Sequence, residues 1–345
     1  MTTRTGKTTS LDIAHLAGLS QSTVSRALNN SPLVNKETRD RVHEIARQLN
    51  YKPDRNAANL RTRKSRTLAL LLFEEETADD SHINPFFLLM IGQITRAAAN
   101  AGYDLLVSFQ RLDEDWHTEY ELSSRADGMI LLGYGDYLDY RPKLEQLADS
   151  EAHFMIWGPM VEDTLGHSLG CDNALGGWLA TRHLLAIGKQ RIAFLGEASH
   201  HCPEFELRHR GFVRALAEAG LEPDPALASE ALDQATGFTG ATRLLENGAP
   251  FDAIFAASDM IALGAIRALR QRGLDVPGDV AVVGFDDIPT ASVVYPSLTT
   301  VQQDTNLAGK LLVRNLIKLI EGESVESGLL APRLVVRESC GGADG

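Results

Sequence analysis

The apolar residues of this chain follow two different patterns. Over residues 8 to 66 they recur at helical spacing in short segments that are separated by turn residues. From Thr67 onward, apolar runs of strand length alternate with amphipathic helical stretches; the runs are LALLLF, DLLVSF, GMILLG and HFMIWG, followed by a second series of RIAFLG, AIFAAS and VAVVGF. Continuous apolar strands between helices indicate parallel sheets that are covered on both faces. Two such series predict two similar α/β lobes.

The N-terminal segment is predicted to hold three helices. The apolar side of the first helix comprises Ile13, Ala14, Leu16 and Ala17. Gly18 makes a turn, and Ser20 is a suitable N-cap for a second helix from residue 21 to about residue 29. A third helix follows over residues 36 to 49. Two helices around a glycine-containing turn, with polar residues at the start of the second, predict a helix-turn-helix, in which the second helix enters the major groove of DNA.

A short helix is expected between this segment and the body. Residues 55 to 60 favour a helix, and a basic linker with Arg61, Arg63, Lys64 and Arg66 follows it. A helix of about seven residues is shorter than the roughly 12 to 15 that an isolated helix needs for marginal stability in water. It therefore needs a partner that orders it. The alternative is that residues 55 to 66 are only a basic linker.

Charge is distributed unevenly along the chain. The 345 residues carry a net charge of −13, with 33 Lys and Arg against 46 Asp and Glu. Residues 1 to 66 hold 13 of the basic and 5 of the acidic residues, so this part has a balance of +8 and the remainder one of −21. A basic segment on an acidic body is typical of nucleic-acid-binding proteins, the alternative being a merely solvated basic surface. The length fits two or three domains, which we place at residues 1–53, 54–66 and 67–340.

The cysteines and the first residues favour a cytoplasmic protein. Cys171, Cys202 and Cys340 are far apart and form no CxxC motif, so a disulfide framework is not expected. The opening MTTRTGKTT lacks the apolar stretch of a secretion signal. No apolar run approaches the roughly 18 residues of a membrane span. We therefore expect neither export nor a membrane partner.

The segments SLDIAHLAGLSQSTVSRALN and VNKETRDRVHEIARQLNYKPDRNAANL resemble the DNA-binding headpiece of the lactose-repressor (LacI/GalR) family of bacterial transcription regulators, and the resemblance continues to about Glu338. It implies an all-α helix-turn-helix headpiece, a hinge helix, and a two-lobe α/β body with the periplasmic-binding-protein-like fold. The crossovers between the lobes would lie near Asp172, Thr300 and Leu330. In this family the hinge helix forms when two copies pack together on operator DNA. A hinge leucine, matched here by Leu60, then inserts into the minor groove.

The resemblance assigns the reading of bases to Gln21, Ser22 and Arg26. Glutamine pairs well with adenine and arginine with guanine, and each pair contributes about 1–3 kcal/mol of discrimination between bases. The other DNA contacts that the resemblance implies are Ser20, Thr23, Ser25 and Asn29 in the headpiece and Asn59 and Leu60 in the hinge. For Ser20 and Thr23 the alternative role is helix capping. A dimer would present the same helix twice and read a palindromic double-stranded operator.

The resemblance also implies an effector site at the carboxyl ends of strands that face each other across a cleft. Its residues would be Phe86 in HINPFF, Asp172 in CDNALGG, Arg208 in ELRHRGF, Leu232 before ATGF, Ser258 in AASDMIALGA, Asp286 in GFDD and Gln303 in LTTVQQD. Arg208 is the central candidate, because a buried guanidinium needs a charged partner or a polar ligand and its fork suits vicinal hydroxyls. Leu232 stands where many relatives carry an aromatic residue, so ring stacking on that side is lost. The alternatives are helix-start packing for Phe86 and, for the aspartates, helix capping or a hydrogen bond at the crossover.

These features predict a cytoplasmic homodimer that represses carbohydrate-utilisation genes and is released by a mono- or disaccharide. The alternatives are a co-repressed regulator or an activator, or a regulator that binds a non-sugar metabolite. The sequence has no P-loop, GxSxG or HExxH motif and no regular metal-ligand spacing, so we expect no enzyme, cofactor or metal site. The acidic segment 74–80 disfavours a strongly anionic effector. The sequence ends without a heptad helix, which favours a dimer formed by body helices, among them those starting at Phe87 and Gly240.

Overall fold

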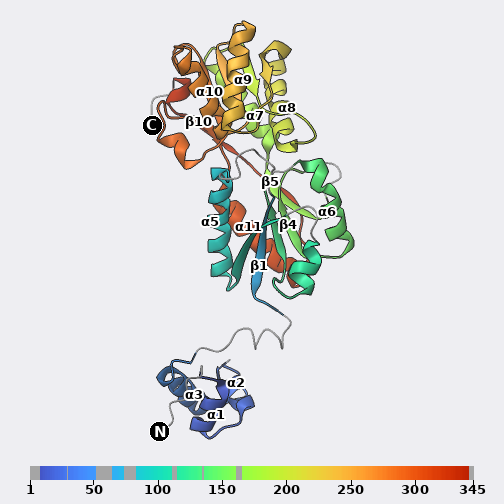
Figure 1. Ribbon diagram of the computed structural model, residues 1–345, viewed down its shortest axis with the longest axis vertical. Helices are drawn as coiled ribbons and strands as arrows, with labels where there is room; N and C mark the ends of the chain where they lie inside the picture. Colours follow the sequence, from blue (N-terminus) through green and yellow to red (C-terminus); the bar gives the residue numbers. More distant parts are fainter. Residues whose placement is uncertain are drawn as a thin grey trace. The chain divides into compact units, whose positions relative to one another are not determined.

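The computed structural model describes residues 8–28, 30–51, 64–73, 83–110, 115–133, 136–160 and 165–341. The chain divides into two compact units, residues 1–65 and residues 66–345 (Figure 1). Asn29, Asn59, Leu60 and the acidic segment 74–80 lie outside the described residues, so their roles stay predictions.

The first unit holds the three helices α1 (Ser10–Ala17), α2 (Gln21–Leu28) and α3 (Lys36–Gln48). Ile13, Val24 and Val42, one from each helix, are fully buried in a common core. α1 ends at Gly18, whose φ of +61° is a conformation that glycine adopts without strain. The predicted helix-turn-helix is confirmed. Of the four residues predicted on the apolar side of the first helix, Ile13, Ala14 and Ala17 are buried, whereas Leu16 is 54% exposed.

Lobe 1 of the second unit is a six-stranded sheet in the order β11-β5-β4-β3-β1-β2, in which all neighbours are parallel. Its strands are β1 (Thr67–Phe73), β2 (Asp104–Gln110), β3 (Met129–Leu132), β4 (Phe154–Trp157), β5 (His167–Cys171) and β11 (Gly328–Leu330). The helices α5 (Pro85–Asn100), α6 (Tyr137–Asp149) and α11 (Thr305–Ile320) pack on it, with a π-helical turn at Thr118–Leu122. β1 has five consecutive buried residues, as expected of a strand covered on both faces.

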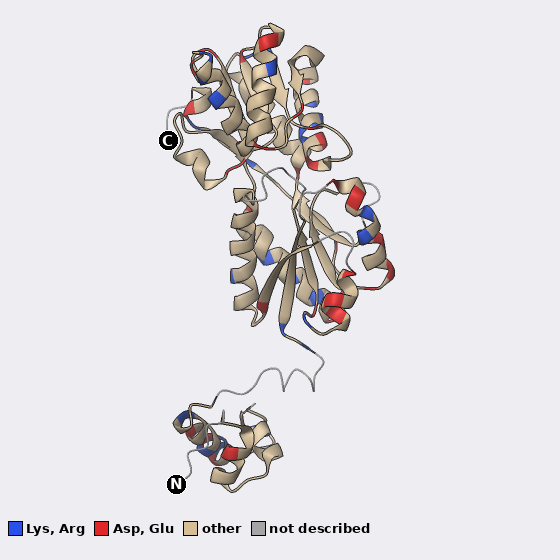
Figure 2. Ribbon diagram, in the orientation of Figure 1, with Lys and Arg blue, Asp and Glu red and all other residues tan. Residues whose placement is uncertain are grey.

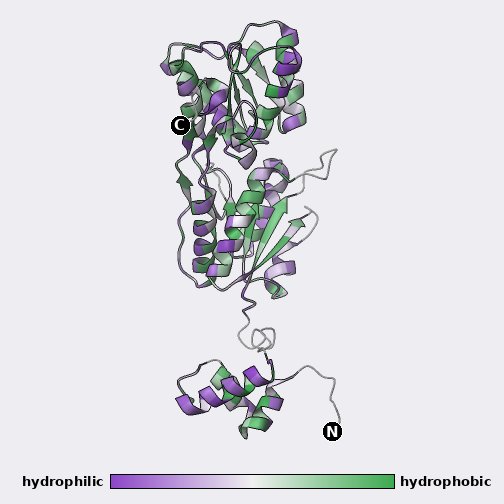
Figure 3. Cartoon of the chain, turned by 90° about the vertical axis from the view of Figure 1, so that its left-hand side faces the viewer, coloured by the Kyte–Doolittle hydropathy of each residue, from purple (hydrophilic) through white to green (hydrophobic). Residues whose placement is uncertain are grey.

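Lobe 2 is a second six-stranded sheet, in the order β12-β10-β9-β8-β6-β7. Its strands are β6 (Ile192–Leu195), β7 (Ala228–Ser229), β8 (Ala253–Ala256), β9 (Ala281–Asp286), β10 (Thr299–Gln302) and β12 (Arg333–Val335). Its α-helices are α7 (Asn173–Ala186), α8 (Pro203–Glu218), α9 (Gln234–Asn247) and α10 (Asp259–Gln271), and short 3₁₀ turns lie at Pro225–Leu227, Pro289–Ser292 and Glu338–Cys340. In both lobes the strands are apolar and carry few charges, while charged residues lie on helices and loops (Figures 2 and 3).

The chain passes between the lobes three times: between β5 and α7, between β10 and α11, and between β11 and β12 (Figure 1). Each strand that leads into a crossing ends there, so the carboxyl ends of the two sheets face one another. One strand departs from the predicted parallel arrangement, because β12 runs antiparallel to β10. β12 enters lobe 2 directly from β11, at the edge where the other strands end, and so has to run in the opposite direction.

Candidate functional site

The N-terminal half of α2 presents the predicted base-reading side chains. Gln21, Ser22 and Arg26 are exposed. The hydroxyl of Ser20 accepts a hydrogen bond from the backbone N–H of Thr23 at 3.2 Å and shares hydrogen bonds with the hydroxyls of Ser22 at 2.9 Å and Thr23 at 2.8 Å. Ser20 is therefore an N-cap in this structure. Arg26 is an exposed, positively charged side chain on α2 and is accessible to a partner.

α8 is held against α7 by contacts that only glycine permits. A Cβ atom at Gly177 of α7 would lie 2.0 Å from the carbonyl oxygen of Arg208, and one at Gly211 of α8 would lie 2.1 Å from the carbonyl oxygen of Ala174. Both distances are far below van der Waals contact and involve backbone atoms. The two glycines therefore let α8 lie close to α7, which places the Arg208 side chain at the carboxyl ends of β8 and β9 and beside Asn173, the first residue of lobe 2 after the crossing from β5.

Arg208 is the centre of a buried polar group, the interlobe site. Its side chain is 1% exposed. Nε donates a hydrogen bond to Oδ1 of Asn173 at 2.9 Å, and Nη1 donates one to the carbonyl oxygen of Ala257. The guanidinium carbon lies 3.7 Å from the centroid of the Phe285 ring, so the cation also rests on an aromatic face. These contacts fix the plane of the guanidinium.

Asp286 and Gln303 complete the interlobe site. Oδ1 of Asp286 lies 3.7 Å from Nη1 of Arg208, and Gln303 Nε2 donates a hydrogen bond to the same oxygen at 2.8 Å. Burial raises the pKa of Asp286 to about 6, while Arg208 and the hydrogen bond from Gln303 act in the opposite direction. The φ of Asp286 is +117°, a strained conformation for a residue with a side chain. The structure thus brings three of the sequence-predicted residues together.

One donor of Arg208 has no acceptor in the part of the chain that the structure describes. Nη2 is buried and has no hydrogen-bond partner among the residues that the structure describes. A buried charged donor left unsatisfied is costly, because the lost hydration is not replaced. The position of Nη2 therefore suits a ligand that offers an oxygen acceptor.

The remaining predicted effector residues have other surroundings. Asp172 and Ser258 are helix N-caps that accept hydrogen bonds from Leu175 N and Ile261 N at 2.9 and 3.3 Å. Phe86 is buried at the start of α5 and packs on the rings of Phe87 and Trp157, with centroids 5.5 and 6.3 Å away. Leu232 is 44% exposed, just before α9. These four residues have local roles, and their contact with an effector stays a prediction.

Three buried polar residues near the site were not among the residues predicted from the sequence. Asn173 holds Arg208, as described above. Asp259, fully buried at the start of α10, accepts hydrogen bonds from the hydroxyl of Thr300 and from Ile288 N at 2.9 Å; burial, together with the nearby Asp286, raises its pKa well above the usual value. Glu204, 5% exposed in the first turn of α8, has a pKa that burial raises to about 7. Acidic residues in a first helical turn are common caps, so the sequence carried no signal that these two are buried.

A direct contact joins the lobes beside α6 and α8. The carboxylate of Asp136, which caps α6 in lobe 1, pairs with Nδ1 of His201, which precedes α8 in lobe 2. The backbone N–H of Tyr137 donates a hydrogen bond to the carbonyl oxygen of His201 at 3.0 Å. The hydrogen bond to Asp136 raises the pKa of His201. This pair of interactions, the interlobe contact, holds the two lobes in the arrangement seen here.

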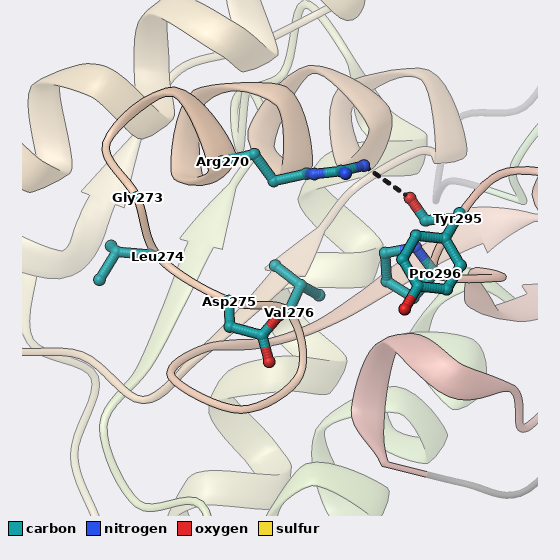
Figure 4. A pocket seen from close by; sticks show the side chains of 7 residues that line it. All are labelled: Arg270, Gly273, Leu274, Asp275, Val276, Tyr295 and Pro296. Carbon is teal, nitrogen blue, oxygen red and sulfur yellow. Dashed lines mark hydrogen bonds between the residues drawn. The ribbon is translucent and has the colours of Figure 1, made fainter.

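A separate open pocket of about 230 Å³ lies on lobe 2 (Figure 4). It is lined by Arg270, Gly273, Leu274, Asp275, Val276, Tyr295 and Pro296. In Figure 4 the guanidinium of Arg270 points to the carbonyl oxygen of Tyr295, to which it donates a hydrogen bond at 3.0 Å. None of the predicted effector residues lines this pocket, so it is distinct from the interlobe site.

Both units of the chain match known protein families. Residues 9–54 match the model of the lacI family of bacterial regulatory proteins, and residues 181–340 match a model of the periplasmic-binding-protein-like domain. The HTH-type transcriptional regulator CelR of Thermobifida fusca is 33% identical over 335 residues, which are 95% of this chain and 96% of CelR.

Two solved structures are similar over almost their full length. One is the lac repressor dimer bound to operator and the anti-inducer ONPF, with a TM-score of 0.83, 27% identity, and coverage of 97% of this chain and 99% of that chain. The other is a CelR–cellobiose complex, with a TM-score of 0.71, 30% identity, and coverage of 96% and 100%.

A helix-turn-helix unit joined to a two-lobe α/β unit defines a DNA-binding transcriptional regulator. This chain belongs to the lacI family of bacterial regulatory proteins, which confirms the predicted family and fold. No helix among the described residues is long and apolar enough to cross a membrane.

Proposed function

We propose that this regulator represses carbohydrate-utilisation genes from the cytoplasm and leaves its operator when a mono- or disaccharide binds between the lobes. The observation that carries the proposal is the unsatisfied Nη2 of Arg208, a buried donor in the interlobe site. A sugar hydroxyl is a suitable acceptor for it. The cellobiose bound by the similar CelR supports a sugar effector. We assign the protein no catalytic activity, because its family consists of DNA-binding regulators.

Operator reading is assigned to α2. Gln21 and Arg26 would pair with base edges. Ser22 would add a further contact to a base edge, either as a hydrogen-bond donor or as an acceptor. The hydroxyls of Ser20 and Thr23 share a hydrogen bond. These two residues would stabilise the start of α2 and contact phosphates of the DNA backbone. The operator bound by the similar lac repressor supports double-stranded DNA as the partner. Two copies would read a palindrome.

A homodimer is supported by exposed apolar side chains on the body. β2 is an edge strand of lobe 1 and exposes Val107 (43%) and Phe109 (49%). Leu88 on the neighbouring helix α5 is 52% exposed. An exposed apolar edge strand invites pairing and is normally covered. In lobe 2, Val293 (80%) and Tyr295 (76%) are far more exposed than any other large apolar residue that the structure describes there, so we assign the contact to this segment in addition to the predicted helix α9.

The mechanism couples the lobes to the hinge. A sugar that contacts Arg208 from one lobe and residues of the other would change the angle between the lobes. The dimer contact would shift with them and disfavour the pairing of the two hinge segments. A ligand shifts this balance only by its different affinity for the two states, and typical couplings are about 1–3 kcal/mol. In co-repression the ligand would bind at the same site but would raise operator affinity instead of lowering it.

The proposal is tested in two steps. A thermal-shift screen of mono- and disaccharides first selects a ligand, and fluorescence anisotropy on DNA from upstream of the chain's own gene then measures operator affinity with and without it. We expect the sugar to weaken operator binding about 5- to 150-fold, the range that such couplings give. An increase in affinity would establish co-repression instead. Operator binding that no sugar changes would contradict the proposal.

Two substitutions distinguish the residues needed for operator binding from those needed for the sugar response. Leu60→Ala is expected to weaken operator binding far more than sugar binding. Arg208→Ala is expected to abolish the sugar response and leave operator binding in place. Equal losses in both assays for either variant would contradict this division.

A further inference from the structure

Glu204 is a buried carboxylate with few donors. It lies in the first turn of α8, and its side chain is 5% exposed. Among the described residues, the one hydrogen bond to its carboxylate comes from its own backbone N–H, and Arg208 is the cation whose charge acts on it. Desolvation of such a group opposes folding. A perturbed carboxylate of this kind, placed beside a binding arginine, points to a role in the site.

The Glu204 carboxylate lies between the lobes. A Cβ atom at Gly158 would lie 3.8 Å from Oε1 of Glu204. Gly158 follows β4 of lobe 1, whereas α8 belongs to lobe 2. The carboxylate therefore reaches the end of a strand in the opposite lobe. The absence of a side chain at Gly158 leaves room for it.

Glu204 and Arg208 act on the same region. They are separated by four residues on α8, so their side chains extend from the same face of the helix. Within the described part of the chain, Nη2 of Arg208 lacks an acceptor and the Glu204 carboxylate lacks a donor other than its own backbone N–H. A hydroxyl group can serve both, because it accepts and donates. A fully deprotonated carboxylate or phosphate group only accepts hydrogen bonds, so it can serve only Arg208 and brings its negative charge close to the Glu204 carboxylate.

The acidic side chains near Arg208 also disfavour the binding of an anionic ligand. Asp286 already lies 3.7 Å from Nη1, and Asp259 is buried at the adjacent start of α10. The charges of Glu204 and Asp286 both act on Arg208, and Asp259 adjoins Asp286. A further negative charge would meet their field in a poorly hydrated region, where charge–charge interactions are strong.

We propose that Glu204 sets the charge selectivity of the interlobe site: it binds a hydroxyl of an uncharged polyhydroxyl effector held by Arg208, and it excludes sugar acids and sugar phosphates. The inference rests on the proposed effector role of the interlobe site. It adds the residue that determines which class of sugar enters.

Inorganic phosphate is the probe for this selectivity. Full-length wild type and Glu204→Gln are titrated with phosphate by calorimetry at pH 8 and constant ionic strength. The control is Glu206→Gln, because Glu206 lies on the same helix but pairs with Arg210 at 2.9 Å and with His200 at 2.9 Å. A double variant, Glu204→Gln with Arg208→Met, identifies the binding site of the phosphate. Glu204→Ser repeats the test with a smaller side chain, and circular dichroism verifies the fold of each variant.

We expect Glu204→Gln to bind phosphate at least tenfold more tightly than wild type, Glu206→Gln to match wild type, and the double variant to lose the gain. Equal binding by wild type and both Glu204 variants, or binding by none of them, would overturn the proposal. A gain that persists without Arg208 would overturn it as well. Since neither DNA nor sugar is present, failure of the repressor proposal would leave this result unchanged and is detected separately by the operator assay.

Discussion

Nη1 of Arg208 and Oδ1 of Asp286 lie 3.7 Å apart, although one residue belongs to the middle of α8 and the other ends β9. Both side chains are almost completely buried. Removing one partner from such a pair leaves an uncompensated charge and typically costs about 3–5 kcal/mol. The pair therefore depends on the exact seating of α8, which connects the stability of lobe 2 with the geometry of the interlobe site.

Gly177→Ala tests this seating. The added methyl group would lie 2.0 Å from the carbonyl oxygen of Arg208, so α8 has to move. We expect a loss of about 1–3 kcal/mol in the free energy of unfolding, as for other overpacked sites, together with weaker sugar binding. Urea unfolding and calorimetry measure the two effects.

The matched control for this substitution is Gly92→Ala in α5, where the new Cβ would have no neighbour within 4 Å. That change is expected to stabilise the helix by about 0.5–1 kcal/mol. Similar effects of the two substitutions would show that the contact between α7 and α8 does not constrain Arg208.

Glu204 is expected to make the stability of the body depend on pH. Its folded-state pKa of about 7 is above the usual value near 4.5, so the folded protein binds more protons than the unfolded chain between these two values. The free energy of unfolding therefore falls as the pH rises through this window and levels off above it. A shift of this size corresponds to about 3 kcal/mol. Urea unfolding from pH 4.5 to 8 measures the slope.

In Glu204→Gln the slope is expected to be smaller, with the variant more stable than wild type at pH 8 and similar to it at pH 4.5. A residual slope of the same sign remains, because burial also raises the pKa values of Asp286 and Asp259. Identical slopes for the variant and wild type would contradict the assigned burial of the Glu204 carboxylate.

The interlobe contact predicts a pH-dependent lobe arrangement. Asp136 raises the pKa of His201, and Glu197 and Asp139 add to this effect. The contact is complete below the usual histidine pKa of about 6.5 and is lost as the pH rises through the higher pKa that His201 has beside Asp136. Double electron–electron resonance between one spin label on α5 and one on α9 is expected to show longer distances at pH 9 than at pH 6.

His201→Ala is expected to remove this pH dependence. The control is His200→Ala, because Nδ1 of His200 pairs with Glu206 at 2.9 Å within lobe 2 and spans no gap between the lobes. A pH response that survives in His201→Ala, or that disappears equally in His200→Ala, would argue against the interlobe contact as its origin.

Arg26 tests the reading face of α2. Arg26→Ala is expected to cost about 1–3 kcal/mol of operator affinity and to relax the preference at one base pair in each half-site. Arg41→Ala, an exposed arginine on α3, is the control and should change affinity equally for all sequences or not at all. Anisotropy against a set of operator base substitutions measures both. A uniform loss across all sequences for Arg26→Ala would indicate a phosphate contact instead.

Local patterns were sufficient to predict most of the fold. The helical spacing around Val24 and Val42 and the apolar runs such as LALLLF depend on neighbours in sequence, and the predicted helices and strands formed there. The antiparallel direction of β12 was not predictable from its own three residues, because it follows from the side on which the last crossing enters lobe 2.

The interlobe site was predictable only in part. Arg208, Asp286 and Gln303 follow from the family resemblance, and the structure brings them together. Asn173 and Glu204 acquire their roles from the close approach of α7 to α8 and from the position of Gly158 of lobe 1 near the Glu204 carboxylate, neither of which leaves a periodic pattern in the sequence.

The role of Arg208 in the sugar response is tested most directly by the operator affinity of wild type and Arg208→Lys, measured by fluorescence anisotropy with and without the sugar that the thermal-shift screen selects. Lysine keeps a positive charge beside Asp286 but cannot place a second donor where Nη2 lies. We predict equal operator affinities without sugar, a loss of about tenfold or more for wild type when the sugar is added, and no change for the variant. An equal loss in both proteins would contradict the claim that the sugar acts through Arg208.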